Sequence, residues 1–167
     1  GLGRIGRLTL RHLLANPHIE VLAINDLTNI ETIAHLMRYD TAQGKLEWPV
    51  NTSDDAFEIN GQRIPYFNEK DPSNLPWGKL GVDLVLECTG VFRDKASVQK
   101  HIDAGAKKVV ISAPAKGNDV PFVVLGVNEE VITPDLDVVS NASCTTNCLA
   151  PVVKVINDAF GISHGFV

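Results

Sequence analysis

Short runs of apolar residues alternate with longer stretches of helical periodicity along most of this chain. Five of the short runs are rich in Val, Ile and Leu and contain few polar residues, which is typical of parallel strands covered on both faces of a sheet. The expected strands are Ile19–Ile24, Val82–Leu86, Lys108–Ile111, Phe122–Leu125 and Val138–Ser140.

Between these runs, apolar residues recur at the spacing of amphipathic helices. Asn29 and Asp94 are suited to cap the starts of two helices, and Gly105 and Gly161 are suited to end two of them. The expected helices are Arg4–Ala15, Glu31–Tyr39, Lys95–Ala104 and Cys148–Phe160. Strands that alternate with helices predict βαβ units, and therefore an α/β fold with a parallel sheet.

One segment departs from this alternation. Asn60 and Gly61 stand between two short runs, Ala56–Ile59 and Gln62–Phe67. Asn-Gly between such runs is the strongest short-range signal for a β-hairpin, because both residues tolerate the positive φ of a tight turn. We therefore expect a small antiparallel excursion from the parallel sheet.

The composition narrows the class of protein. Apolar residues make up 44% of the 167 positions and charged residues 21%, which is ordinary for a soluble globular domain. Acidic residues outnumber basic ones, 20 against 15, and no basic stripe argues for a specific nucleic-acid partner. No apolar run approaches ~18 residues, so no membrane partner is expected. An odd number of cysteines and no signal peptide favour a reducing compartment.

The chain opens on a glycine-rich pattern, G-x-G-x-x-G, formed by Gly1, Gly3 and Gly6. A helix and a strand follow, and Asp26 lies 20 residues beyond Gly6. This is the fingerprint of a dinucleotide site, because glycines let the backbone approach a pyrophosphate and the helix N-terminus offers free N–H groups. The Asp26 carboxylate would bind the adenosine ribose hydroxyls and repel the 2′-phosphate of NADP.

The alternative interpretation is a glycine turn before an ordinary helix, with Asp26 as a surface turn residue. A phosphate-binding loop needs a strand before it, and that strand would precede Gly1. We therefore expect residues upstream of Gly1, or a chain that is a fragment of a longer protein.

A turn rich in small and hydroxyl residues, Ser140–Cys148, follows the last expected strand and opens a helix. Cys144 would lie near the helix N-terminus, where the dipole and free N–H groups favour a thiolate and can hold an oxyanion. The hydroxyls of Ser143 and Thr145 are suited to binding phosphate. This pattern predicts covalent catalysis by an activated thiol.

The other cysteines and the histidines have plainer interpretations. We expect Cys148 to lie inside the helix and face the core, and Cys88 to be shielded at a strand end. Too few further ligands lie near Cys144 and Cys148 for a metal site, so no metal is expected. We expect His101 to be solvated, and we give His164 no catalytic role.

The motifs together resemble the N-terminal half of phosphorylating glyceraldehyde-3-phosphate dehydrogenases. They run in family order over the whole chain, and the nine-residue cysteine motif is highly specific. The segments that carry the resemblance are Gly1–Arg7, Asn25–Leu27, Cys88–Phe92, Ala104–Val109, Ile111–Lys116, Gly126–Asn128 and Ser140–Cys148.

The resemblance implies NAD as cofactor and a set of contacts to it. Arg4 and Ile5 would contact the pyrophosphate through their backbones, Asp26 would hold the ribose and Arg38 would reach the adenine edge. Ser112 would face the nicotinamide side. The implied cofactor-binding residues are Gly1, Gly3, Arg4, Ile5, Gly6, Asp26, Arg38, Thr89, Gly90, Phe92 and Ser112. The implied catalytic residues are the nucleophile Cys144, with Ser143 and Thr145 binding phosphate.

The resemblance also implies a fold, a reaction and partners. The expected fold is a Rossmann-type, doubly wound NAD-binding domain over residues 1–143, followed by the beginning of a catalytic domain over residues 144–167. The implied enzyme is a cytoplasmic homotetramer of glycolysis and gluconeogenesis. It oxidises glyceraldehyde 3-phosphate with NAD and inorganic phosphate to 1,3-bisphosphoglycerate, through a cysteine thiohemiacetal and thioester.

Some features depart from the family pattern. Leu2 stands where the family often has Phe, Cys88 stands where it often has Ser, and the sequence ends before the family's catalytic histidine. These 167 residues alone are therefore expected to be inactive. Two rival functions stay open: an erythrose-4-phosphate dehydrogenase, which shares the cysteine turn, and a non-catalytic NAD-binding fragment.

Overall fold

The strands form two separate sheets in the computed structural model, which describes residues 1–167. One sheet has the order β1-β4-β3-β2 and the other β5-β6-β7. The pairs β1–β4, β5–β6 and β6–β7 are parallel, whereas β2–β3 and β3–β4 are antiparallel. The strands are β1 (Ile24–Asn25), β2 (Val50–Ser53), β3 (Ala56–Ile59), β4 (Gln62–Phe67), β5 (Leu84–Glu87), β6 (Lys108–Ile111) and β7 (Val138–Ser140).

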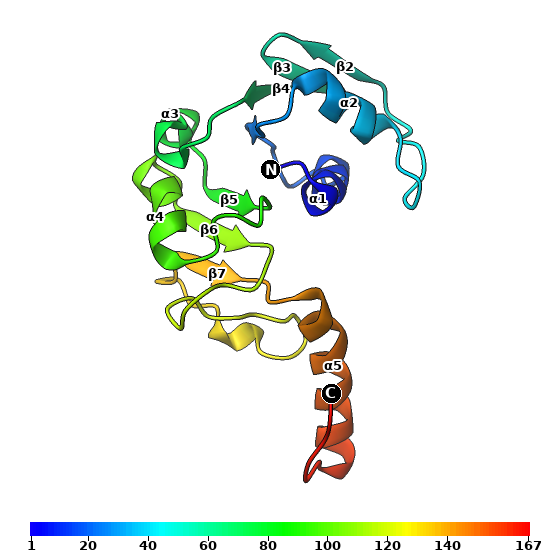
Figure 1. Cartoon of the computed structure of the whole chain (residues 1–167), viewed down its shortest axis with the longest axis vertical. Helices are drawn as coiled ribbons and strands as arrows, with labels where there is room; N and C mark the ends of the chain where they lie inside the picture. Colours follow the sequence, from blue (N-terminus) through cyan, green and yellow to red (C-terminus); the bar gives the residue numbers. More distant parts are fainter.

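The helices connect and cover these strands. In Figure 1, α2 lies against the first sheet, α4 lies against the second, and α1 occupies the concave side between the two sheets. The helices are α1 (Arg4–Ala15), α2 (Ile30–Arg38), α3 (Trp77–Leu80), α4 (Lys95–Asp103) and α5 (Cys144–Phe160), with short 3₁₀ turns η1 (Pro72–Asn74) and η2 (Glu129–Val131). The α/β fold with a parallel sheet and an antiparallel excursion is therefore confirmed.

Local capping signals set several of the boundaries. The side chain of Asn29 accepts a hydrogen bond from the Thr32 N–H at 2.8 Å and starts α2. Asp94 and Ser97 form a reciprocal capping box at the start of α4. The hairpin turn between β3 and β4 has φ of 51° at Asn60 and 74° at Gly61, as the Asn-Gly signal predicted.

Two of the predicted strands are wrong in extent. Of Ile19–Ile24, only Ile24 belongs to a strand, because its pairing with Tyr66 and that of Asn25 with Phe67 are the only ladder contacts of β1. Segment Phe122–Leu125 makes only an isolated bridge, between Phe122 and Ser140.

The Asn128 side chain accounts for the short pairing of the second segment. Its amide accepts from the Val124 N–H at 2.8 Å and donates to the Phe122 carbonyl at 2.9 Å. A side chain that bonds these backbone groups competes with a sheet ladder for them.

A third correction concerns α5, which begins at Cys144 rather than Cys148, because Ser143 caps it.

The apolar core has three parts. The largest is a cluster of 11 buried residues, including Leu10, Met37 and Ile64, that joins α1 and α2 to the first sheet. A second cluster lies between α4 and the parallel sheet, and a third surrounds Trp77. Each sheet is thus stabilised by the apolar face of the helices that cover it.

The edges of β1 and β5 that face each other have no strand partner. A cavity of about 690 Å³ separates them, and its lining includes Leu2, Leu10, Leu84 and Leu86. Doubly wound sheets commonly have the strand order 3-2-1-4-5-6. In this structure β4 and β1 would take positions 3 and 2 of that order, and β5, β6 and β7 would take positions 4, 5 and 6. The cavity lies at the remaining position, so one strand would fit between β1 and β5. A strand before Gly1 stays a prediction.

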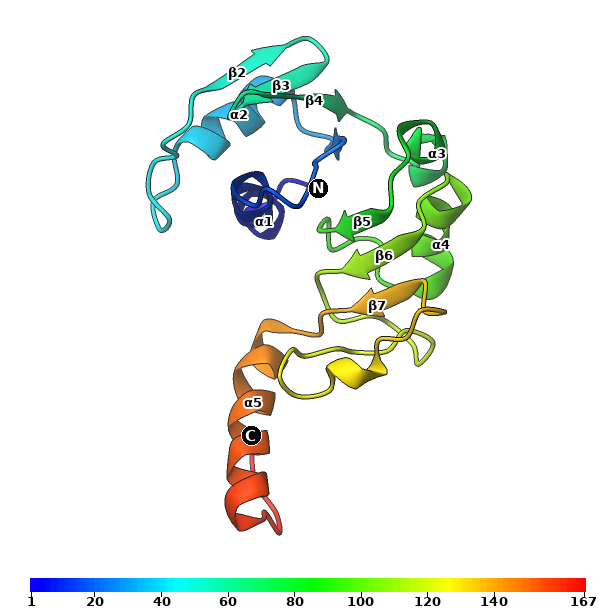
Figure 2. The ribbon, with the colours of Figure 1, turned by 180° about the vertical axis from the view of Figure 1, so that it is seen from behind.

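Helix α5 projects away from the rest of the molecule (Figure 2). None of its residues is buried, and Phe160 is 86% exposed. Its exposed apolar side chains are Leu149, Val152, Val153, Val155, Ile156 and Phe160. None of the helices combines the length and hydropathy needed to cross a membrane.

The contact between α3 and the end of α4 gives a test of the packing. Gly105 has φ of 105°, and a Cβ there would lie 2.5 Å from the Gly78 Cα. We expect Gly105→Ala to lower the free energy of unfolding by about 2–5 kcal/mol, because it adds overpacking to an unfavourable backbone conformation. Gly117, with φ of 80° and open space around it, is the matched control, and Gly117→Ala should cost only about 1–2 kcal/mol. Equal losses in chemical denaturation of the full-length protein would contradict the contact.

Candidate functional site

The glycine-rich turn leads directly into α1. Gly3 is the N-cap of this helix, and its carbonyl accepts from the Arg7 N–H at 3.0 Å. The N–H groups of Arg4, Ile5 and Gly6 have no hydrogen-bond acceptor within the chain. The first turn of α1 also contains no acidic residue. The helix N-terminus is therefore free to bind an anion such as a phosphate group.

Asp26 lies beside this turn, just after β1. One carboxylate oxygen accepts from the Leu2 N–H, and the other accepts from the Thr28 N–H at 2.8 Å. Partial burial acts to raise the pKa of Asp26, but the hydrogen bonds from Leu2 and Thr28 outweigh it and place the pKa below its ordinary value. Asp26 is therefore a stable carboxylate, and the tertiary structure brings it next to the glycines.

The turn after β5 packs on the same glycines. A Cβ on Gly1 would lie 2.8 Å from the Thr89 Cγ2, and a Cβ on Gly6 would lie 1.9 Å from the Gly1 carbonyl oxygen. A larger residue at Gly6 would therefore displace the backbone, and one at Gly1 would displace the Thr89 side chain and crowd the Thr89 backbone. Gly90, which follows Thr89, has φ of 73° and continues the turn in a conformation suited to glycine.

The other predicted cofactor residues occupy different surroundings. Arg38 donates through Nε and Nη2 to the Val50 carbonyl, at 3.1 and 2.6 Å, and no hydrogen bond links it to the glycine turn. Phe92 packs edge-on against the ring of His101, beside the apolar cluster between α4 and the parallel sheet. Ser112 follows β6, and its backbone N–H donates to the Glu87 carbonyl at 3.0 Å. The roles assigned to these residues stay predictions.

The cysteine turn follows β7 at the same edge of the sheet. Because β5, β6 and β7 are parallel, their carboxyl ends lie side by side, with Thr89, Ser112 and Asn141 in the turns beyond them. The Asn141 N–H donates to the Ile111 carbonyl at 2.9 Å, which continues the connection from strand to strand. The topology therefore places the turn after β5, which packs on the glycines, and the cysteine turn along one edge of the sheet.

The cysteine turn itself is held in a strained conformation. Ala142 has φ of 56°, which is uncommon for a residue with a side chain. The Ser140 hydroxyl accepts from the Ala142 N–H at 3.1 Å and donates to the Ala113 carbonyl at 2.8 Å. The Asn147 amide donates to the carbonyls of Asn141 and Ser143 at 2.7 and 2.9 Å. Strain that is stabilised in this way is typical of functional turns.

The hydrogen bonds of Asn147 give it a positioning role that sequence reasoning did not assign. Its place within the cysteine motif was the only available signal.

Cys144 is the first residue of α5 and is exposed. The Ser143 hydroxyl accepts from the Thr146 N–H at 3.0 Å and lies 2.9 Å from the Thr145 hydroxyl. An exposed thiol, a helix N-terminus and clustered hydroxyls therefore coincide at this turn, which suits thiol addition to a phosphorylated substrate.

The remaining cysteines differ from each other. Cys88 is partly buried, and this burial raises the pKa of its thiol above the ordinary value. The prediction that Cys148 faces the core is wrong, because Cys148 is exposed. The physical reason is that α5 has no packing partner for its apolar face within these residues.

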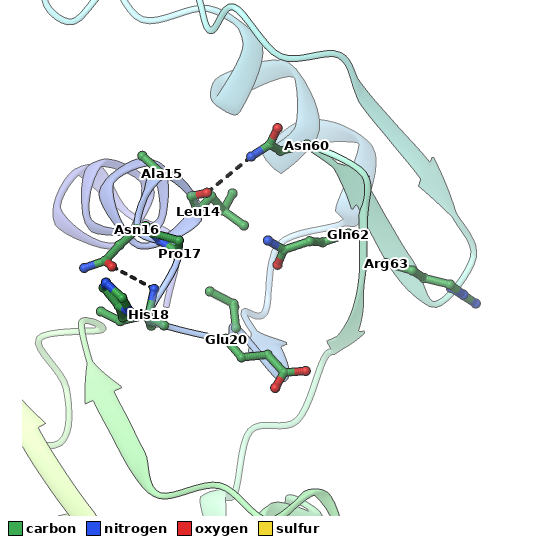
Figure 3. A pocket seen from close by; sticks show the side chains of 11 residues that line it. Leu14, Ala15, Asn16, Pro17, His18, Glu20, Asn60, Gln62 and Arg63 are labelled. Carbon is green, nitrogen blue, oxygen red and sulfur yellow. Dashed lines mark hydrogen bonds between the residues drawn. The ribbon is translucent and has the colours of Figure 1, made fainter.

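A second hollow, of about 830 Å³, lies at the C-terminal end of α1 (Figure 3). Its lining comes from residues 14–21 and from Asn60, Gln62 and Arg63 of the hairpin. In Figure 3 the Asn60 amide reaches the Leu14 carbonyl, whereas Arg63 points away from the hollow. None of the predicted site residues lines it, so it is separate from the candidate site. No cluster of His, Cys, Asp and Glu in the structure is suited to hold a metal ion.

Two family models match this sequence. One describes the NAD binding domain of glyceraldehyde 3-phosphate dehydrogenase and matches residues 1–95, and the other describes its C-terminal domain and matches residues 143–167. The chain belongs to the glyceraldehyde-3-phosphate dehydrogenase family. The resemblance inferred from the motifs is thereby confirmed, and residues 1–95 belong to a domain that binds NAD.

Individual relatives agree with this assignment. Glyceraldehyde-3-phosphate dehydrogenases of Clostridium pasteurianum and Debaryomyces hansenii are both 54% identical to this chain, over 167 and 168 residues. Glyceraldehyde-3-phosphate dehydrogenase 3 of Saccharomyces cerevisiae is 52% identical over 169 residues. Each comparison covers 100% of this chain and 50% of the relative. The chain thus spans about half the length of the curated relatives that it matches.

The glycines offer a test that separates packing from ligand approach. A Cβ on Gly3 would meet nothing within 4 Å, so Gly3→Ala, which only weakens the N-cap of α1, should lower the melting temperature less than Gly6→Ala. It would, however, place a methyl group where the pyrophosphate approaches α1, and we expect the Kd for NAD to rise about tenfold. Gly6→Ala should lower the melting temperature as well, because its Cβ would collide with the Gly1 carbonyl. Calorimetric titration of full-length protein measures the affinities, and unchanged NAD binding by Gly3→Ala would contradict the site.

Proposed function

We propose that the whole protein oxidises glyceraldehyde 3-phosphate with NAD and inorganic phosphate and forms 1,3-bisphosphoglycerate, in glycolysis and gluconeogenesis. One observation carries the proposal: Cys144 starts α5 at the same edge of the parallel sheet as the turn that packs on the glycines. The names of the relatives support the same activity.

The residues present fit NAD. Three unpaired N–H groups of α1 suit its pyrophosphate, and Gly1 and Gly6 keep side chains out of the turn. Asp26 would hold the adenosine ribose, while Thr89 and Gly90 would line the adenine side, with Phe92 close to the adenine ring. Arg38 would use its remaining guanidinium N–H groups at the adenine edge, and Ser112 would face the nicotinamide side. When bound, NAD accepts the hydride.

The chemistry at Cys144 follows from its position. The thiolate attacks the aldehyde carbon and forms a C–S bond, and the carbonyl oxygen gains a proton to complete the thiohemiacetal. The N–H groups at the start of α5 stabilise the developing negative charge on that oxygen. Loss of a hydride from the carbon and of the hydroxyl proton leaves a thioester. Inorganic phosphate then attacks the thioester, and the C–S bond breaks to restore the thiolate.

Ser143 and Thr145 would donate hydroxyl hydrogen bonds to phosphate oxygens. Both residues lie at the helix start, beside the reacting sulfur, where the dipole also favours an anion. We also propose that the NAD-binding domain spans residues 1–143, that residues 144–167 begin a catalytic domain, and that the protein is a cytoplasmic homotetramer.

The nucleophile is tested with the three cysteines in the full-length protein. We expect iodoacetamide to label Cys144 first and Cys88 last near neutral pH, because burial keeps the Cys88 thiol neutral. Cys144→Ser should abolish aldehyde oxidation while NAD binding persists. Cys148→Ser, at an exposed cysteine one turn further along α5, is the matched control and should retain activity. Activity in Cys144→Ser would contradict the mechanism, and faster turnover of erythrose 4-phosphate would favour the rival substrate.

The cofactor preference is tested at Asp26. We expect Asp26→Gly to weaken NAD binding about ten- to a hundredfold, because a charged hydrogen bond to the ribose is lost. The variant should also reduce the difference between the Kd for NAD and the Kd for NADP. Asp26→Asn, which keeps an acceptor for the Leu2 N–H, controls for disturbance of the glycine turn and should still relax the rejection of NADP. Titration of both cofactors measures the preference. The role of Asp26 is wrong if wild-type protein binds NADP as tightly as NAD.

A further inference from the structure

A chain of three buried side chains lies beneath the turn that follows β5. Trp77 on α3, His101 on α4 and Glu87 at the end of β5 are only 5%, 4% and 3% exposed. The prediction that His101 is solvated is therefore wrong, since α4 packs its inner face on the sheet. The Trp77 Nε1–H donates to the His101 Nδ1 at 3.0 Å, and the His101 Nε2 lies 3.1 Å from a Glu87 carboxylate oxygen.

The chemistry of these groups sets the direction of the hydrogen bonds. An indole N–H can only donate, so the Nδ1 of His101 is the acceptor. In neutral His101 the Nε2 then carries the hydrogen and donates to Glu87. The other oxygen of Glu87 accepts from the Thr89 backbone N–H at 2.7 Å. Burial acts to raise the pKa of Glu87, but the hydrogen bonds from His101 and Thr89 outweigh it and place the pKa below its ordinary value.

This series of hydrogen bonds ends at the Thr89 backbone N–H, and Thr89 contacts the glycine turn. A Cβ on Gly1 would lie 3.0 Å from the Thr89 Cα, and a Cβ on Gly6 would lie 3.4 Å from the Cys88 Cβ. Glu87 therefore orders the segment against which the glycine turn packs: Gly1 meets the Thr89 backbone, and Gly6 meets Gly1 and the Cys88 Cβ. A buried carboxylate is costly unless it is paired, so a shift of Thr89 would leave an acceptor of Glu87 unsatisfied.

We propose that Trp77, His101 and Glu87 are positioning residues of the cofactor site, which fix the Thr89 backbone and, through Gly1 and Gly6, the N-terminus of α1. This role rests on the proposed NAD site and adds residues that do not touch the cofactor. The three side chains come from three different elements. Their hydrogen bonds therefore couple the placement of α3 and α4 to the geometry in which α1 meets the pyrophosphate.

Substitutions at His101 in the full-length protein test the proposal. His101→Leu removes both hydrogen bonds, and we expect the Kd and the KM for NAD to rise about tenfold or more, with a smaller change in kcat. His101→Gln is the conservative variant, because one amide offers an acceptor to Trp77 and a donor to Glu87. It should restore most of the affinity. Val98→Ala, on the same helix but fully buried without polar contacts, is the stability control and should lower the melting temperature without a change in Kd.

A spectroscopic signal provides a second measurement. With 5-fluorotryptophan in place of tryptophan, NAD binding should shift the ¹⁹F resonance of Trp77 in the wild-type protein and not in His101→Leu. Trp48, which is partly buried and packs against the cluster of 11 buried residues, is the internal control. Trp77→Phe and Trp48→Phe each remove one resonance and thereby assign the Trp77 and Trp48 signals. If His101→Leu does not fold, Trp77→Phe is used instead, because it removes the hydrogen bond from Trp77 to His101. Its Kd for NAD is then compared with that of the wild-type protein.

The outcomes separate this role from a purely structural one. His101→Leu that melts at a lower temperature but binds NAD like the wild-type protein would overturn the proposal, as would failure of His101→Gln to restore affinity. Wild-type protein that binds no NAD would overturn both this role and the proposed function. Wild-type protein that binds NAD but does not oxidise glyceraldehyde 3-phosphate would contradict only the proposed reaction, and the Kd comparison would still support or overturn the positioning role.

Discussion

The close contact between the glycine-rich turn and the turn after β5 is the constraint on which the candidate site depends. Without side chains at Gly1 and Gly6, the start of α1 can lie against Thr89 and Cys88. The same approach lets the Leu2 N–H reach the Asp26 carboxylate at the end of β1. Three segments that are far apart in the sequence thus meet at one point, where α1 presents its unpaired N–H groups.

Because β5, β6 and β7 are parallel, the turns that follow them lie side by side along one edge of the sheet. The turn after β5 contacts the glycines, and the turn after β7 contains Cys144. The residue that follows β6 or β7 donates its backbone N–H to the last residue of the neighbouring strand, Ser112 to the Glu87 carbonyl and Asn141 to the Ile111 carbonyl. The cysteine turn is then fixed by the side chains of Ser140 and Asn147, which stabilise the left-handed conformation of Ala142. The sheet therefore brings the turn beside the glycines and the cysteine turn to one edge.

Two surfaces show what these residues leave unsatisfied. The unpaired edges of β1 and β5 enclose an apolar cavity, and the apolar side chains of α5 are exposed although residues 143–167 match a domain of their own. Apolar faces of this kind are normally covered in a folded protein. This chain spans half the length of its relatives, and both of these apolar surfaces lack a packing partner within its 167 residues.

Local signals in the sequence determined the helices α1 and α4, the Asn60–Gly61 hairpin, the glycine-to-Asp26 spacing and the cysteine turn, because caps, turn residues and periodicity act within a few residues. Only the tertiary structure decided the rest. The ladder of β1 and the fate of Phe122–Leu125 depended on distant hydrogen-bond partners, and the exposure of Cys148 depended on what packs against α5. Likewise, Glu87 and His101 became a buried pair because burial is set by contacts between elements rather than by local sequence.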